Sequence, residues 1–297
     1  MAAPLRIGVL DQSPIVAGAT AADALEASLK LAQFADQRGF SRYWFAEHHG
    51  SEAFAGAAPE VLIGQALART RRIRVGSGGV MLMHYSPLKV AETFNLLQTL
   101  YPDRVDLGIG RAPGSDGITA AALAYGSQIG IEYFPAKLAD LAAFLESRKP
   151  HSEGLAPVQA RPRVTRPPGL WMLGSSTDGA QLAAQFGLPY CHAHFIGPEH
   201  TAAASNHYLD RFQPAPELTG QLGCRRPQLA LGVFVSIAET DEEAQLQGRC
   251  RDLWRLRIAR GEFLPFPSRQ EAREARFSAA EAAHLESKAA HAIQGTP

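Results

Sequence analysis

The chain has 297 residues, of which 46% are apolar and 20% are charged, a composition typical of a soluble globular protein with one large core or two small ones. Its 29 Lys and Arg residues balance its 29 Asp and Glu residues, so it lacks the basic excess that a general nucleic-acid surface needs. The N-terminus shows no secretory leader and no apolar run approaches the ~20 residues of a membrane span, so we expect a cytoplasmic protein that binds neither nucleic acid nor membrane.

Short runs rich in β-branched or aromatic residues alternate with longer amphipathic stretches in the first half of the chain. We expect strands at 6–10, 40–46, 73–83 and 104–110, and helices at 21–39, 59–70 and 87–101. This repeated strand–helix order predicts parallel strands joined by crossover helices. The strands contain few polar residues, which favours a sheet that is covered on both faces.

The second half is less regular. A helix is expected at 136–147 and a loop rich in Pro and Arg at 148–168. Strands follow at 169–174, 188–196 and 229–237, with helices at 178–186 and 199–212 between them. From residue 241 the chain is rich in Ala, Glu and Arg and mostly helical, and 291–297 fit either a short strand or a loop.

These elements predict an α/β fold of the (β/α)₈ TIM type. Seven strand candidates are present, whereas a closed barrel of this type has eight. We therefore expect a single barrel domain over residues 1–297 that lacks its last strand and helix. An open, doubly wound sheet is the alternative, but the chain has no GxGxxG loop after its first strand.

Three cysteines, at positions 191, 224 and 250, are far apart and form no CxxC pair. A disulfide framework or a zinc–thiolate site would need paired spacing, so we expect reduced thiols and no structural metal.

The segment Glu47-His48-His49 ends the second predicted strand. Side chains at the carboxyl ends of barrel strands point into the mouth where active sites form. An imidazole in that position can act as an acid or a base near neutral pH. These residues are therefore the first candidates for catalysis.

Glycines interrupt the third strand at Gly76, Gly78 and Gly79. Glycine weakens a strand, so this cluster indicates that another group, such as a flat cofactor ring, approaches the backbone closely. After the fourth strand, Arg111 is placed to reach a phosphate.

Another candidate phosphate site lies where a predicted strand leads into a helix. Ser175 and Ser176 stand at that junction, where free N–H groups and hydroxyls would suit a phosphate. Further along, His192 and His194 alternate on a predicted strand and so share a face. Together with His48 or His49 they form a possible metal site, although no Asp or Glu ligand is evident.

Six segments of the chain resemble, in order and spacing, the bacterial luciferase-like flavin monooxygenase family. They read LDQSPI, WFAEHHG, VGSGGVMLMHYSPLKVAE, RVDLGIGRAPGSD, LGSSTDGAQLAAQFGLP and HAHF, and the resemblance extends over residues 5–297. It is greatest to single-chain members similar to the luciferase alpha subunit. The resemblance implies a (β/α)₈ barrel that binds reduced FMN at its C-terminal mouth.

The resemblance also implies roles for individual residues. His48 matches the family's catalytic histidine, and Arg111 matches an arginine near the flavin phosphate. Gly78 and Gly79 match a non-prolyl cis peptide under the flavin ring. Ser175 and Ser176 match the phosphate-binding turn. The implied substrate pocket contains Glu47, His49, His194 and Phe195.

The chain departs from the luciferase pattern in three places. Gly110 stands where the alpha subunit has a reactive cysteine, and the Ser-Ser turn lacks the glutamate of the luciferase version. Residues 291–297 match a segment that relatives follow with a helix, an eighth strand and a final helix. We therefore expect two unpaired barrel edges, which are a stability and aggregation hazard. Three explanations are open: another chain covers the gap, the chain is shortened, or the protein is a degraded copy.

The resulting hypothesis is a two-component monooxygenase, in which a separate flavin reductase supplies reduced FMN. O₂ then oxidises an aldehyde or another small organic substrate, and His48 manages protons. No segment resembles an NADH-binding fingerprint, which fits this delivery of the flavin. A deazaflavin is the alternative cofactor, and a homodimer is expected because family members often pair through helices of the first half.

Two other functions remain open from the sequence. A flavin-binding protein without turnover would bind the cofactor but form no oxygen-dependent product. A metal-dependent barrel hydrolase would use His48, His49, His192 and His194 and would contain stoichiometric metal.

Overall fold

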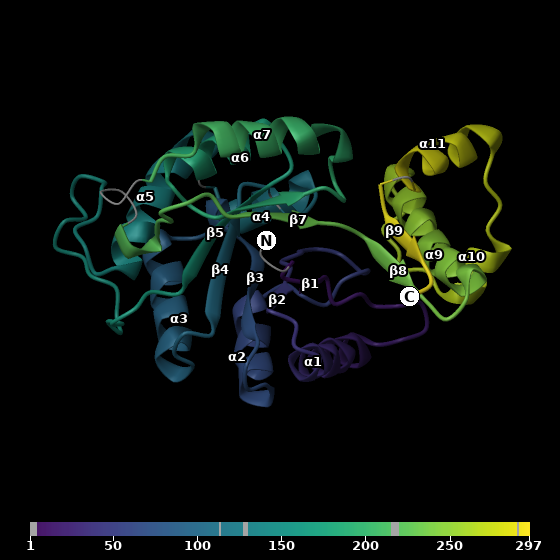
Figure 1. Cartoon of the computed structure of the whole chain (residues 1–297), viewed down its shortest axis with the longest axis horizontal. Coiled ribbons are helices and arrows are strands. Elements are labelled where there is room, and N and C mark those ends of the chain that lie inside the picture. The colour runs from purple at the N-terminus through teal and green to yellow at the C-terminus, as the bar shows by residue number, and fades with distance from the viewer. Residues whose placement is uncertain (1–4, 113, 127–129, 215–219, 290) are drawn as a thin grey trace.

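Seven parallel strands, paired in chain order, form the main sheet of the computed structural model, which describes residues 5–112, 114–126, 130–214, 220–289 and 291–297 (Figure 1). They form a nearly closed barrel of the TIM type. The strands are β1 (Gly8–Asp11), β2 (Arg42–Phe45), β3 (Arg74–Met81), β4 (Val105–Gly110), β5 (Gly169–Gly174), β6 (Tyr190–Ala193) and β7 (Leu229–Gly232).

Helices connect successive strands and continue beyond the sheet. They are α1 (Ala21–Gln37), α2 (Pro59–Arg69), α3 (Pro87–Leu100), α4 (Gly117–Ala124), α5 (Phe134–Leu145), α6 (Thr177–Gln185), α7 (Thr201–Arg211), α9 (Asp241–Ala259), α10 (Arg269–Glu274) and α11 (Ala279–Ala289). All the strands and helices expected before residue 212 are present, with small shifts of their ends. Helix α4 was not expected, because its short Ala-rich run has no buried face.

Local sequence signals explain where several helices begin and end. Thr20 caps α1 through a capping box, in which its hydroxyl accepts from the N–H of Asp23 and the Asp23 carboxylate accepts from the N–H of Thr20. The helix ends before Gly39, whose φ of +79° is in the left-handed region. Pro59 and Pro87 stand in the first turns of α2 and α3, where a missing N–H costs nothing.

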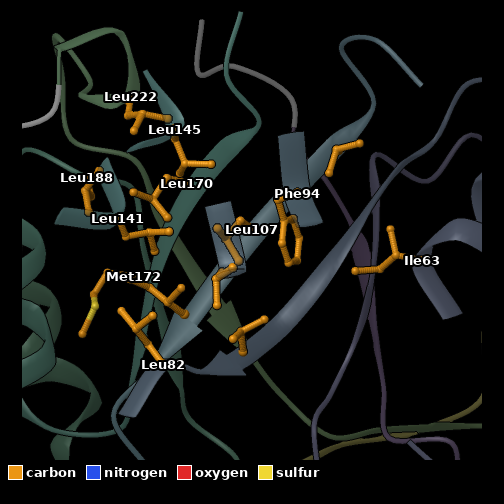
Figure 2. Packing of buried hydrophobic residues seen from close by; sticks show 14 of the residues in the cluster. Ile63, Leu82, Phe94, Leu107, Leu141, Leu145, Leu170, Met172, Leu188 and Leu222 are labelled. Atoms are coloured by element: carbon orange, nitrogen blue, oxygen red, sulfur yellow. The ribbon is translucent and has the colours of Figure 1, made fainter. Parts of the chain in front are cut away.

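The core lies between the sheet and the helices that cover it (Figure 2). Every residue of β4 is buried, as expected for a strand with cover on both faces. The side chains packed there come from strands and helices alike, including Leu107 of β4, Ile63 of α2, Phe94 of α3 and Leu141 of α5.

The sheet has two free edges in the part of the chain that the structure describes, because β1 and β7 stand at its two ends. This confirms the expected barrel without an eighth strand. The single strand expected at 229–237 is wrong, however. The chain leaves the sheet after β7, and β8 (Val235–Ile237) pairs instead with β9 (Ile293–Gly295) in a separate two-stranded sheet.

The C-terminal helices α9, α10 and α11 form a group with β8 and β9 beside α1 and β1 (Figure 1). Backbone hydrogen bonds join this group to the loop after β1: the N–H of Ala17 donates to the carbonyl of Phe266, and the N–H of Phe266 donates to the carbonyl of Ile15. The group therefore contacts the loop that follows the edge strand β1. None of the described helices is both long and apolar enough to cross a membrane.

Candidate active site

The predicted site residues lie after the carboxyl ends of neighbouring strands. Glu47, His48 and His49 follow β2, Arg111 follows β4, and Ser175 and Ser176 follow β5. His194 and Phe195 follow β6, and Gly78 and Gly79 lie in the second half of β3. Because parallel barrel strands end at one rim, the fold brings these residues to the same end of the molecule.

Glu47 links the loop after β2 to the segment after β3. Its side chain is 1% exposed, and its carboxylate accepts a hydrogen bond of 3.2 Å from the N–H of Met81. Its Oε1 lies 2.8 Å from His49 Nε2 and 2.8 Å from the Tyr85 hydroxyl. A buried carboxylate needs such donors, so Nε2 of His49 carries the proton that completes the set.

A third loop joins this cluster. The N–H of His49 donates to the carbonyl of Gly114, which follows β4. A Cβ on Gly114 would lie 3.0 Å from the Glu47 carbonyl oxygen, and its φ of +63° favours glycine. Loops after three consecutive strands are thus held against one another.

His48 has a different environment from His49. Its ring stacks on Phe54 at 4.5 Å, and its Nδ1 is buried without a hydrogen-bond partner among the described residues. Burial, and secondarily the neighbouring His49, lower the pKa of His48 to about 4. The His48 imidazole is therefore neutral near pH 7.

The glycine segment of β3 leaves no room for side chains. The Gly78–Gly79 peptide bond is cis, which confirms the geometry that the resemblance implied. A Cβ on Gly79 would lie 2.7 Å from Leu173 Cδ1 and 2.8 Å from the Gly108 carbonyl oxygen. The pairing of β3 with β4 also shifts register between Gly78 and Val80.

Arg111 meets the N-terminus of α6. Its Nη2 lies 3.2 Å from Oδ2 of Asp178, in the first turn of that helix. Ser176 is the N-cap residue of α6, but its hydroxyl makes no capping hydrogen bond. A guanidinium, a free hydroxyl and a helix N-terminus are donors that suit a phosphate.

A buried tyrosine–histidine pair is hydrogen-bonded to this turn. The Tyr190 hydroxyl lies 3.2 Å from the Ser176 carbonyl oxygen and 3.1 Å from His192 Nδ1. His192 is 0% exposed, its Nε2 lies 3.3 Å from the Gly197 carbonyl oxygen, and burial lowers its pKa. His192 is therefore part of the scaffold and does not face the mouth.

His194 and Phe195 lie beside the C-terminal group. His194 Nδ1 lies 2.7 Å from the Thr201 hydroxyl, and its ring is 5.6 Å from the ring of His291. The ring of Phe195 is 5.2 Å from the ring of Phe234. The histidines of the metal hypothesis thus have separate partners, and the described residues include no group of three His, Cys, Asp or Glu that would hold a metal ion.

Several residues at this site were not among the sequence candidates. Tyr85 bonds Glu47, Phe54 stacks on His48, and Trp254 of α9 packs its ring 5.4 Å from Phe54. A tryptophan such as Trp254 in a helix rich in charged residues indicates a buried contact. Nothing in the sequence indicated which contact.

The chain is similar to known proteins over nearly its whole length. A family model described as luciferase-like monooxygenase matches residues 5–297. The N-acetyl-S-alkylcysteine monooxygenase of Bacillus subtilis (strain 168) is 40% identical over 269 residues, which cover 90% of this chain and 78% of the relative. The crystal structure of apo-MsnO8 is 38% identical with a TM-score of 0.84, and the match covers 99% of this chain and 86% of that one.

More distant structures share the fold. The oxygenating constituent of 3,6-diketocamphane monooxygenase from Pseudomonas putida, in complex with FMN, is 16% identical with a TM-score of 0.65, over 98% of this chain and 84% of that one. The coenzyme F420-dependent tetrahydromethanopterin reductase from Methanopyrus kandleri is 13% identical with a TM-score of 0.68, over 99% of this chain and 87% of that one.

Proposed function

This chain belongs to the luciferase-like monooxygenase family, and we propose that it uses reduced FMN and O₂ to oxidise an aldehyde or another small organic substrate. One observation carries the proposal. Arg111 and the Ser175–Ser176 turn form a phosphate-type donor set at the same rim as His48, whose buried Nδ1 has no partner among the described residues. Such a reaction needs residues that bind the phosphate of FMN and a residue that transfers protons.

The donor set fits the terminal phosphate of FMN. The N-terminus of α6 and the Ser176 hydroxyl would donate to phosphate oxygens, and Arg111 would neutralise charge in place of its contact with Asp178. Gly78 and Gly79 would let the flavin ring approach the backbone of β3. A distant structural neighbour that holds FMN supports this choice, and an F420-dependent neighbour makes a deazaflavin the second candidate.

Bound reduced FMN would supply the electrons that activate O₂. The protein residues would orient the reactants and exclude water. His48, neutral at pH 7, would hold or accept a proton at Nδ1. Glu47, through His49, Tyr85 and the Met81 N–H, would keep the loops after β2 and β3 at a set distance.

Partners follow from the same proposal. A separate flavin reductase would deliver reduced FMN, since the chain has no fingerprint for a nicotinamide cofactor. The homodimer that the family resemblance implies stays a prediction.

The test is an anaerobic titration with reduced FMN, followed by mixing with O₂ and decanal and analysis of products by mass spectrometry. We expect saturable binding and an oxygen-dependent acid product that a His48→Ala variant loses while it still binds FMN. Binding with release of hydrogen peroxide and no product from aldehydes or organic acids would instead support a flavin-binding protein without turnover. No binding of reduced FMN would contradict both functions.

A further inference from the structure

Helix α9 places two arginines on one aromatic ring. The guanidinium carbon of Arg251 lies 5.5 Å from the ring centre of Phe234, and that of Arg255 lies 5.0 Å from it. The two residues are one helical turn apart and therefore share a face of α9. Arg255 also donates through Nη2 to the carbonyl oxygen of Phe195, which follows β6 at the barrel rim.

This pair has more positive charge than its surroundings neutralise. Arg251 is 5% exposed, and its Nε and Nη2 both donate to Oδ1 of Asp252, at 2.9 and 2.8 Å. Its Nη1 is buried and has no acceptor among the described residues. Within the described residues, no carboxylate lies at salt-bridge distance from Arg255, whose pKa is lowered by burial and by the charge of Arg251.

A buried guanidinium with an unsatisfied donor is costly, so proteins normally place an acceptor beside it. Among the described residues, Asp252 pairs with Arg251 and no carboxylate pairs with Arg255. An anion bound by the protein would supply the acceptor that the described residues do not. A carboxylate fits best because its two oxygens match the planar donor fork of arginine, and the Phe234 ring supplies an apolar floor.

The pair is connected to the candidate catalytic histidine. On the same helix, Trp254 packs its ring 5.4 Å from Phe54, and Phe54 stacks on His48 at 4.5 Å. Trp254 Nε1 is a second buried donor that has no partner in the part of the chain that the structure describes. The helix that carries the two arginines thus also contacts the ring of His48, through Trp254 and Phe54.

We propose that the substrate is an organic acid whose carboxylate binds Arg251 and Arg255, which directs its reacting end toward His48. The inference rests on the proposed monooxygenase function, because it names the substrate class of that same site. The FMN phosphate is assigned elsewhere, to Arg111 and the N-terminus of α6, so the chain has two separate anion sites at one rim.

The experiment compares acids with their uncharged amides. Hexanoate, octanoate, benzoate and 4-phenylbutanoate, each beside its carboxamide, are titrated by calorimetry into the full chain with and without FMN. The variants are Arg251→Gln, Arg255→Gln, Arg255→Lys and, as a matched control, Arg260→Gln. Arg260 is the C-cap residue of the same helix and pairs with Glu281 at the surface. Circular dichroism checks that each variant is folded.

We expect at least one acid to bind about ten-fold more tightly than its amide, because only the carboxylate carries the charge that the guanidinium groups attract. Either Gln variant should lose that preference. Arg255→Lys should keep part of it, and Arg260→Gln all of it. An acid preference that survives in both Gln variants, or none in the wild type, overturns the proposal.

Titrations with FMN and riboflavin separate this inference from the function it rests on. FMN binding without any acid preference sinks the anion site and leaves the flavin proposal standing. Acid preference without FMN binding would contradict the flavin proposal and leave the anion site standing. If Arg255→Gln weakens FMN but not riboflavin, the arginines hold the cofactor phosphate and the substrate assignment is wrong.

Discussion

The Tyr85 hydroxyl donates a 2.8 Å hydrogen bond to Oε1 of Glu47, and so joins the segment after β3 to the end of β2. Glu47 is almost fully buried, and its carboxylate depends on three donors, of which Tyr85 is the one that lies farthest along the chain. Removal of any donor leaves a buried charge less well compensated. The pair is therefore a good place to test how the site is held together.

Tyr85→Phe should lower the free energy of unfolding by about 1–3 kcal/mol, since it removes a donor to a buried carboxylate and leaves the ring in place. Urea denaturation measures the change. Tyr125→Phe is the control, because Tyr125 is 95% exposed, and it should shift stability by less than about 0.5 kcal/mol. Equal stabilities of the two variants would show that Glu47 does not rely on Tyr85.

Acid should destabilise the protein through His48. Its pKa is about 4 in the folded chain, below its ordinary value of 6.5, so the unfolded chain takes up the proton first as pH falls. The contribution of His48 is therefore complete above about pH 6.5 and is lost progressively between pH 6.5 and 4.

Denaturant unfolding at pH 7.5, 5.5 and 4.5 measures this slope, and His48→Gln should flatten it. His151→Gln, at an exposed position, should leave the slope unchanged. A wild-type slope that His48→Gln does not alter would contradict the assignment of a neutral, buried imidazole.

Arg111→Met should weaken FMN binding about ten-fold or more, because it removes a charged donor to the phosphate. Riboflavin, which lacks the phosphate, should bind the variant as it binds the wild type. Arg166→Met is the control, since Arg166 lies elsewhere, paired with Asp103 and 65% exposed. Loss of riboflavin affinity as well would show that the substitution disturbs the ring site or the fold.

Asp178→Asn should change FMN affinity in the opposite direction to Arg111→Met. Asp178 competes with a phosphate for Arg111 and places a negative charge at the N-terminus of α6. Its neutralisation should tighten FMN binding and leave riboflavin unaffected. Fluorescence titration of both flavins measures the difference, and weaker FMN binding would place the phosphate away from this turn.

Gly79→Ala should destabilise the chain by roughly 1–3 kcal/mol, the usual cost of overpacking. The new Cβ would lie 2.8 Å from the Gly108 carbonyl oxygen, which belongs to a paired strand and cannot move aside. Gly117→Ala is the control, since no atom lies within 4 Å of its added Cβ. Thermal unfolding compares the two, and a neutral Gly79→Ala would mean that β3 and β4 are less tightly packed than the distances indicate.

The sequence anticipated most of the barrel because its signals are local. Strand–helix alternation and caps such as Thr20 depend on neighbours within a few residues, so the first seven strands were found in order. The run at 229–237 was misassigned for the same reason. Its composition favours a strand throughout, but the pairing partner changes from β6 to β9 near Val233, and strand pairing is a long-range choice.

Sequence by itself determined the strand–helix order before residue 212 apart from α4, the glycine segment of β3, and the place of His48 and Arg111 at strand ends, because a parallel barrel brings all such ends to one rim. Only the tertiary structure decided that His192 is linked to the Ser176 turn through the Tyr190 hydroxyl. It also decided that Arg251 and Arg255 of α9 share the Phe234 ring beside that rim. Those relationships join segments tens of residues apart. They depend on how loops and helices pack in space, which no local pattern specifies.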